Sequence, residues 1–212
     1  SASAIRASLL QADVQHNSWK SEGSLKQMPP AAAQIMRNNY NRKTPVYSND
    51  FSLLLKAKLL TETCDSLIEY ADISEALARR IINQRNQFVN WDAFCELLKT
   101  KDMTYSRISR ALMHILLNIR TEDMTAYQAE QNCCYARVLG FRKEQTEILK
   151  LFKQNSSVPV ITKLGQIDSL SNAGQKMSDT DCYASNLYES VVTDKFHTPF
   201  IEEHSKSLVL YE

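Results

Sequence analysis

The sequence predicts a mainly α protein, a helical bundle-like domain with at most a short extended segment. Three observations carry this expectation. Only 4 of the 212 residues are glycine, alternating runs of β-branched residues are short, and apolar residues recur at the spacing of helices. A hydrophobic content of 43% with 23% charged residues is typical of an ordinary globular protein that can bury a core.

Helix start signals are spread along the first half of the chain. Ser3 is predicted to cap a short first helix, and the Pro-Pro pair at 29 and 30 begins a second one that extends to about residue 40. Asn49 or Asp50 can cap a third helix. Apolar stripes then predict a helix that begins at residue 74 and a short amphipathic one over 91–98.

The segment from Lys99 to Ile119 joins a cationic entry to a strongly apolar helix, for which Thr104 is the predicted cap. Four cations gather around the helix N-terminus, whose unpaired N–H groups already favour negative charge: Lys99, Lys101, Arg107 and Arg110. Because cations oppose the dipole at this end, a purely stabilising role is disfavoured. Two interpretations remain open. The four cations contact the phosphates of a nucleic acid, or they form a basic face that only solvent contacts.

The second half predicts fewer regular elements. A helix is expected to begin at Thr121 and to run to Leu139 with Gly140 just past its end, although residues 133–139 also suit a strand. Further predictions are a helix over 143–153, a short extended piece over 158–162 and a last helix over 179–192.

Charge is distributed unevenly, although the formal net charge is only +1. Residues 79–163 carry 14 basic and 8 acidic side chains, whereas residues 164–212 carry 3 and 8. This pattern fits a nucleic-acid face on the middle segment or an acidic tail that folds over it, and the sequence does not choose between them.

Catalytic motifs are missing from the sequence. It contains no phosphate-binding glycine loop and no nucleophile elbow, so no catalytic residue is assigned. Five cysteines without a C-x-x-C pair and four histidines without ligand spacing argue against a disulfide framework and a metal site. The cysteines favour a reducing, cytoplasmic location, and no apolar run has the length of a membrane span.

Several groups of residues occur in a suggestive order: Ser1-Ala-Ser-Ala-Ile-Arg6, Asp50-Phe-Ser52, Lys99-Thr-Lys101 with Thr104-Tyr-Ser-Arg107 and residues 110–117, Tyr135-Ala-Arg-Val-Leu-Gly-Phe141, and Pro159-Val-Ile-Thr-Lys163. Together they resemble the bacterial tRNA(Met) cytidine acetate ligase family. The resemblance implies an ATP-dependent enzyme that activates acetate as acetyl-adenylate and acetylates N4 of the wobble cytidine of elongator tRNA(Met).

The resemblance also implies roles for particular residues. ATP, with Mg²⁺, would be contacted by Ser3, Ile5 and Arg6, and the expected tRNA contacts are Lys99, Lys101, Tyr105, Arg107, Arg110, Arg79 and Arg80. It further implies a C-terminal portion that lacks the parent's N-terminal α/β nucleotidyltransferase domain, which would bind most of the ATP, and that is inactive by itself.

On this interpretation residues 1–28 end the nucleotidyltransferase domain and form a linker, residues 29–163 form a helical tRNA-binding domain, and residues 164–212 form an acidic tail region. The expected partners are tRNA, acetate and ATP, without a membrane. The alternative is a helical protein-interaction or lid domain of a nucleotidyltransferase that acts on a small metabolite.

Overall fold

The computed structural model of the chain describes residues 4–7, 9, 10 and 28–211. The chain divides into two compact units. Unit 1 comprises residues 1–47 and 191–200, and unit 2 comprises residues 48–190 and 201–212. The functional division into residues 1–28, 29–163 and 164–212 remains a prediction.

Unit 1 is helical where it is described. Residues 4–7 and 9–10 are helical, and α3 (Pro30–Asn39) begins with proline in its first turn, as predicted. Leu9 and Ala33 are buried against each other, and Ile5 packs onto this pair together with three further apolar side chains, those of Met28, Met36 and Tyr40. The predicted cap Ser3 lies outside the described residues.

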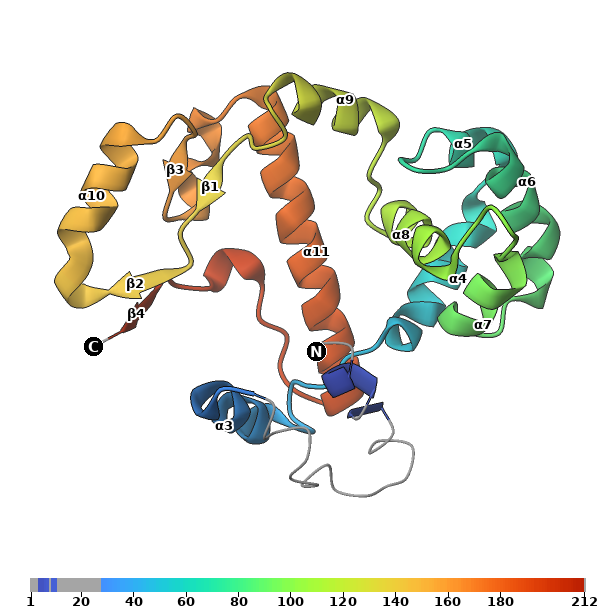
Figure 1. Cartoon of the computed structure of the whole chain (residues 1–212), viewed down its shortest axis with the longest axis horizontal. Coiled ribbons are helices and arrows are strands. Elements are labelled where there is room, and N and C mark those ends of the chain that lie inside the picture. The colour runs from blue at the N-terminus through green and yellow to red at the C-terminus, as the bar shows by residue number, and fades with distance from the viewer. Residues whose placement is uncertain (1–3, 8, 11–27, 212) are drawn as a thin grey trace. The chain divides into compact units, whose positions relative to one another are not determined.

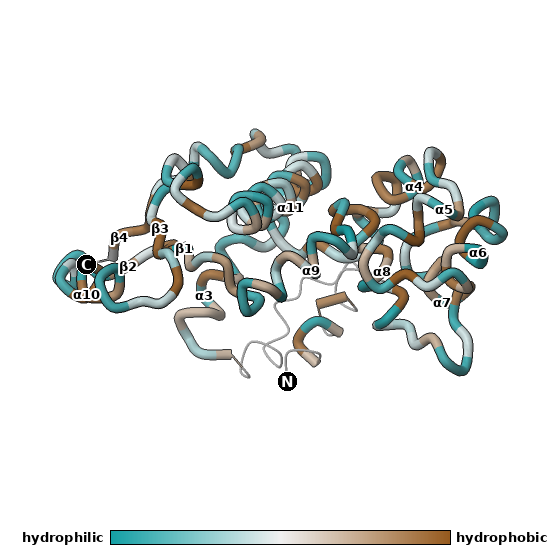
Figure 2. Tube along the Cα trace, turned by 90° about the horizontal axis from the view of Figure 1, so that it is seen from above, coloured by the Kyte–Doolittle hydropathy of each residue, from teal (hydrophilic) through white to brown (hydrophobic). Residues whose placement is uncertain are grey.

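The first part of unit 2 is a cluster of short helices (Figure 1). It comprises η1 (Ser48–Phe51), α4 (Ser52–Thr61), α5 (Cys64–Ile68), α6 (Glu75–Gln84), η2 (Arg85–Gln87), α7 (Trp91–Leu98) and α8 (Tyr105–Leu116). Each of the longer helices alternates hydrophobic and hydrophilic stretches along its length (Figure 2). The apolar faces meet in one core, whose largest fully buried side chains include Trp91, Tyr70, Phe94, Leu77 and Leu112.

Side-chain caps explain why these helices begin where they do. Ser74 accepts a hydrogen bond from the Leu77 amide, and Asn90 accepts one from the Ala93 amide. Each satisfies one of the backbone donors that a helix start leaves unpaired. The predictions of a helix start at residue 74 and of a helix over 91–98 are therefore confirmed.

The second part of unit 2 contains the strands. After α9 (Thr121–Ala129) the chain forms β1 (Ala136–Arg137), β2 (Gly140–Arg142), η3 (Lys143–Gln145), α10 (Thr146–Asn155), β3 (Val160–Ile161) and η4 (Leu164–Ser169). The long helix α11 (Asn172–Phe196), η5 (Glu203–Ser205) and β4 (Val209–Tyr211) complete it, with the last turns of α11 belonging to unit 1.

These strands form two parallel pairs. Ala136 lies opposite Val160 and Arg137 opposite Ile161, while β2 pairs with β4 from Gly140 opposite Val209 onward. The fold is therefore not a helical bundle with at most one extended segment, and that prediction is wrong. The predicted helix over 121–139 ends at residue 129, and Gly140 begins a strand instead of ending a helix.

Strands of only two or three residues explain the error, because they are too short for a periodicity argument to detect their alternation. The extended piece predicted over 158–162 is confirmed as β3. Among the described residues no helix is long and apolar enough to cross a membrane.

Candidate nucleic-acid interface

The predicted cationic entry is an ordered turn that leads into α8. Thr100 accepts a hydrogen bond from the Met103 amide at 3.2 Å, and its own amide donates to the Met103 carbonyl. Thr104 caps the helix by accepting from the Arg107 amide at 3.4 Å. Behind this entry the apolar face of α8 is buried, which fixes the helix and leaves the polar face outside. The turn therefore presents Lys101 at a fixed place beside the positive end of the helix.

Two of the predicted RNA-binding cations are exposed and unpaired. Within the part of the chain that the structure describes, neither Lys101 nor Arg107 makes a side-chain hydrogen bond or ion pair. Both flank the helix N-terminus, where the dipole and the unpaired amides add to their positive potential. An anion that binds there displaces solvent without breaking an internal contact.

Three other predicted cations are exposed but ion-paired. Arg79 pairs with Glu75 at 3.0 Å, Lys99 with Glu96 at 3.3 Å and Arg110 with Asp72 at 2.7 Å. Exposed pairs of this kind stabilise a protein by only ~0–1 kcal/mol, so a phosphate can compete for the cation. These three are weaker candidates than Lys101 and Arg107, since their charge is already compensated.

The remaining two predicted contacts have internal roles. The Arg80 guanidinium is half-buried and donates to the carbonyls of Leu97 at 2.8 Å and Lys99 at 3.5 Å, at the end of α7. The hydroxyl of Tyr105 donates to Asp92 at 2.6 Å, and burial together with this contact raises its pKa. Both side chains hold helices together, and their assignment to RNA stays a prediction.

The residues expected to contact ATP lie in unit 1 and are only partly described. Ile5 is half-buried in the small apolar cluster around Leu9, which is a packing role. Arg6 is exposed on the helical residues 4–7, so its guanidinium is accessible to a phosphate. Ser3 lies outside the described residues. Of the two described residues of this set, Arg6 alone is exposed, and the contact of the set with ATP stays a prediction.

Among the described residues there is no group of three or more histidine, cysteine or acidic side chains that could hold a metal ion. All five cysteines are free thiols, three of them buried. Burial raises the pKa of Cys95 to about 12, so this thiol stays protonated and unreactive.

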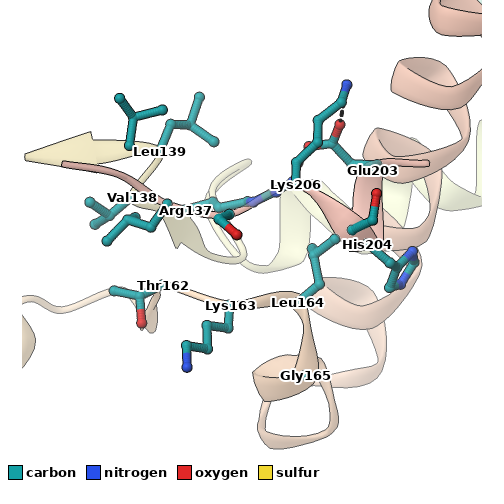
Figure 3. A pocket seen from close by; sticks show the side chains of 14 residues that line it. Arg137, Val138, Leu139, Thr162, Lys163, Leu164, Gly165, Glu203, His204 and Lys206 are labelled. Carbon is teal, nitrogen blue, oxygen red and sulfur yellow. Dashed lines mark ion pairs between the residues drawn. The ribbon is translucent and has the colours of Figure 1, made fainter. Parts of the chain in front are cut away.

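A cavity that the sequence did not predict lies where the carboxyl ends of β1 and β3 meet (Figure 3). It has a volume of about 600 Å³ and is lined from residues 137–139, 162–165 and 203–209. Its two strand-end walls come from the motifs Tyr135–Phe141 and Pro159–Lys163. The sequence shows the order of these motifs in the chain but not their parallel pairing. Ligands often bind at the carboxyl ends of parallel strands, and this rule was the signal that could have found the cavity.

Glu203 organises one side of this cavity. Its carboxylate lies 2.9 Å from Arg137 Nη1 and 2.9 Å from Lys206 Nζ, and it accepts a hydrogen bond from the Ser185 hydroxyl. Burial alone would raise its pKa, but the contacts with Ser185, Lys206 and Arg137 outweigh burial and lower it. Glu203 is therefore an ionised carboxylate, and it ties the segment after α11 to both the helix and β1.

Known proteins resemble this chain over almost its whole length. A tRNA(Met) cytidine acetate ligase of Alkaliphilus metalliredigens (strain QYMF) is 30% identical over 190 residues, which cover 87% of this chain and 45% of that protein. One of Bacillus subtilis (strain 168) is 28% identical over 201 residues, covering 90% of this chain and 45% of that protein. The chain thus spans about half the length of these relatives.

The fold is also found in a solved structure. The crystal structure of Thermotoga maritima TmcAL (apo, form I) superposes with a TM-score of 0.84 at 20% identity, covering 99% of this chain and 50% of that one. A second crystal form of the same protein, bound with alpha-thio ATP, also gives a TM-score of 0.84. This likeness shows the fold, and the sequence relatives confirm the predicted resemblance to tRNA(Met) cytidine acetate ligases.

The family match corrects the predicted fold class a second time. The model of the family described as HIGH Nucleotidyl Transferase matches residues 1–202, so the expectation of a helical fragment outside the nucleotidyltransferase fold is wrong. The match also removes the basis for assigning most of the ATP contacts to a missing domain. A match that covers 202 of the 212 residues means that the chain belongs to the HIGH nucleotidyl transferase family.

Proposed function

We propose that the chain acts as, or within, a tRNA(Met) cytidine acetate ligase. The reaction activates acetate with ATP as acetyl-adenylate and transfers the acetyl group to N4 of the wobble cytidine of elongator tRNA(Met). The relatives that carry this name support the proposal through their identity over most of the chain. Mg²⁺ accompanies the ATP, and Arg6 contacts a phosphate of the nucleotide.

Within this function, unit 2 binds the tRNA backbone at the entry to α8. The single observation that carries this role is the pair of exposed, unpaired cations Lys101 and Arg107 beside a helix N-terminus. Neither is needed to neutralise a carboxylate of the protein. Each is therefore free to replace counterions on a phosphate, which is the main source of affinity for nucleic acids.

The test is a filter-binding titration of elongator tRNA(Met) at several salt concentrations, with wild-type protein and the double variant Lys101→Ala/Arg107→Ala. Loss of two phosphate contacts should flatten the plot of log affinity against log salt by about two units. Lys150→Ala is the matched control, since Lys150 is also an exposed lysine, on α10. An unchanged slope in the double variant would remove these residues from the interface.

The activity itself needs a separate experiment. Mass spectrometry of tRNA from cells that lack the gene should show loss of N4-acetylcytidine in elongator tRNA(Met). Normal levels of the modification would refute the acetate ligase assignment and favour a nucleotidyltransferase acting on a small metabolite.

A further inference from the structure

Helix α10 carries an apolar stripe that the rest of the described chain leaves largely uncovered. Ile148, Leu151 and Phe152 are 45%, 57% and 61% exposed. Their spacing of three and four residues places them on one face of the helix. No residue of α10 is buried. Single exposed apolar side chains are ordinary on a protein surface, but a contiguous stripe on a helix without a packing partner marks an interaction surface.

Further exposed apolar side chains lie near the start of α10. The helix follows β2 after η3, and its first turn lies beside β2 and β4 (Figure 1). Leu139, just before β2, and both Val209 and Leu210 on β4 are at least half exposed. Within the part of the chain that the structure describes, this pair has no third strand. A two-stranded sheet is marginally stable unless something packs on it, so this part of unit 2 gains from a partner.

The two ends of α10 carry opposite charges. Glu147 lies in the first turn of the helix and Lys153 in the last. Both side chains are exposed, and neither forms an ion pair or a side-chain hydrogen bond with another described residue. Each charge suits the dipole at its own end of the helix, which is a stabilising role that leaves the side chain accessible. Both charges are therefore available to a partner that presents the opposite sign at each end.

A second copy of α10 presents that pattern when the two helices pack antiparallel. A two-fold axis between them brings the Glu147 end of each copy to the Lys153 end of the other, so unlike charges and unlike dipole ends adjoin twice. Ile148 and Phe152 lie two residues on either side of position 150, near the middle of the helix, so each stripe can cover the other. Parallel packing would instead bring like charges together. This self-complementary pattern favours a second copy over an unrelated protein.

We propose that the chain forms a symmetric dimer in which α10 packs antiparallel against α10 of a second copy, with the exposed side chains around β2 and β4 at the edge of the contact. A helix of 10 residues offers less than the ~800 Å² that each partner of a stable complex typically buries. We therefore expect a reversible dimer with a Kd on the order of 10 μM. The proposal does not depend on the acetate ligase assignment, because it rests on α10 and its surroundings alone.

The test is sedimentation velocity of the full chain at protein concentrations from about 1 to 100 μM. Leu151→Asp places a charge in the stripe. Leu53→Asp is the matched control, since Leu53 is a leucine on α4 that is 78% exposed, and Lys150→Ala changes the side of α10 away from the stripe. Glu147→Lys, Lys153→Glu and the double variant with both changes test the charge pattern. Circular dichroism verifies that each variant is folded.

Wild type should shift from monomer to dimer across this range, Leu151→Asp should stay monomeric, and both controls should behave as wild type does. Each single charge reversal should weaken the dimer about tenfold, because attraction becomes repulsion at both symmetry-related ends, and the double variant should recover. A wild-type chain that stays monomeric overturns the proposal and leaves the stripe to a different partner. Association that Leu151→Asp leaves unchanged, an equal loss in Leu53→Asp, or a double variant that does not recover also overturns it.

Discussion

Replacing Glu203 by glutamine should destabilise unit 2 while keeping the shape of the side chain. The carboxylate side chain is 10% exposed, and its partners Arg137 and Lys206 are 18% and 36% exposed. Removing one member of a buried ion pair costs ~3–5 kcal/mol, because the other charge is left without compensation. Lys206 is partly solvated and retains Glu189 at 3.6 Å, so most of the cost falls on Arg137. We expect a loss of about 2–3 kcal/mol in the free energy of unfolding.

The assay is urea unfolding of wild type and Glu203→Gln, followed by circular dichroism. Glu202→Gln serves as the matched control, since Glu202 is the exposed neighbour, and it should change stability by less than ~0.5 kcal/mol. An equal loss in both variants would mean that the negative charge in this segment stabilises the fold only through long-range attraction and not through the ion pair of Glu203. A stability of Glu203→Gln equal to that of wild type would refute the ion-pair argument.

The pH dependence supplies a second test of the same carboxylate. The pKa of Glu203 in the folded chain is lowered from its ordinary value of 4.5, so its ionised form stabilises the fold above that value. Below the unfolded-state pKa the side chain must lose a proton when the chain folds, so this contribution to stability shrinks. It is lost as pH falls through the lowered folded-state pKa. The stability difference between wild type and Glu203→Gln should be full at pH 7 and should narrow below about pH 4.5. A difference that stays constant down to pH 3 would contradict this.

Two further substitutions test the core and the helix cluster. Leu112 on α8 is 0% exposed, so Leu112→Ala should lower the free energy of unfolding by about 3 kcal/mol in urea titrations. A loss below ~1 kcal/mol would mean that the core around Leu112 is packed less tightly than described. Tyr105→Phe removes the hydrogen bond to Asp92 and should lower the free energy of unfolding by about 1 kcal/mol without changing the affinity for tRNA. A clear loss of tRNA affinity at unchanged stability would instead assign Tyr105 to the RNA-binding surface.

Helices could be predicted from the sequence where a cap and an apolar stripe coincide. The helix after Thr104 is one example, because this predicted cap accepts a hydrogen bond from the Arg107 amide and the side chains of the predicted apolar stripe, such as Leu112, are buried. The pairing of the strands could not be predicted, since Ala136 and Arg137 owe their extended form to a partner more than twenty residues away. Gly140 illustrates the same limit, because a glycine after an apolar run also suits a helix end.

The functional surface shows a different limit of sequence reasoning. Arg80 and Arg107 are both arginines on cationic helices, and nothing local distinguishes them. The difference is that the end of α7 places the carbonyl of Leu97 2.8 Å from the Arg80 guanidinium, and only packing determines that contact. Residue type therefore identified the cations, whereas their availability for a ligand follows from the fold.

The acidic C-terminal segment has partners that bear on the RNA proposal. Glu203 pairs with Arg137, and Asp181 accepts a hydrogen bond from the Tyr135 hydroxyl, so this segment does fold onto the middle of the chain. Those contacts lie at β1 and its approach. Among the described residues none of its carboxylates pairs with Lys101 or Arg107. The carboxylates of the acidic segment therefore have partners other than the basic entry of α8. Lys101 and Arg107 remain available for an anion from outside the chain.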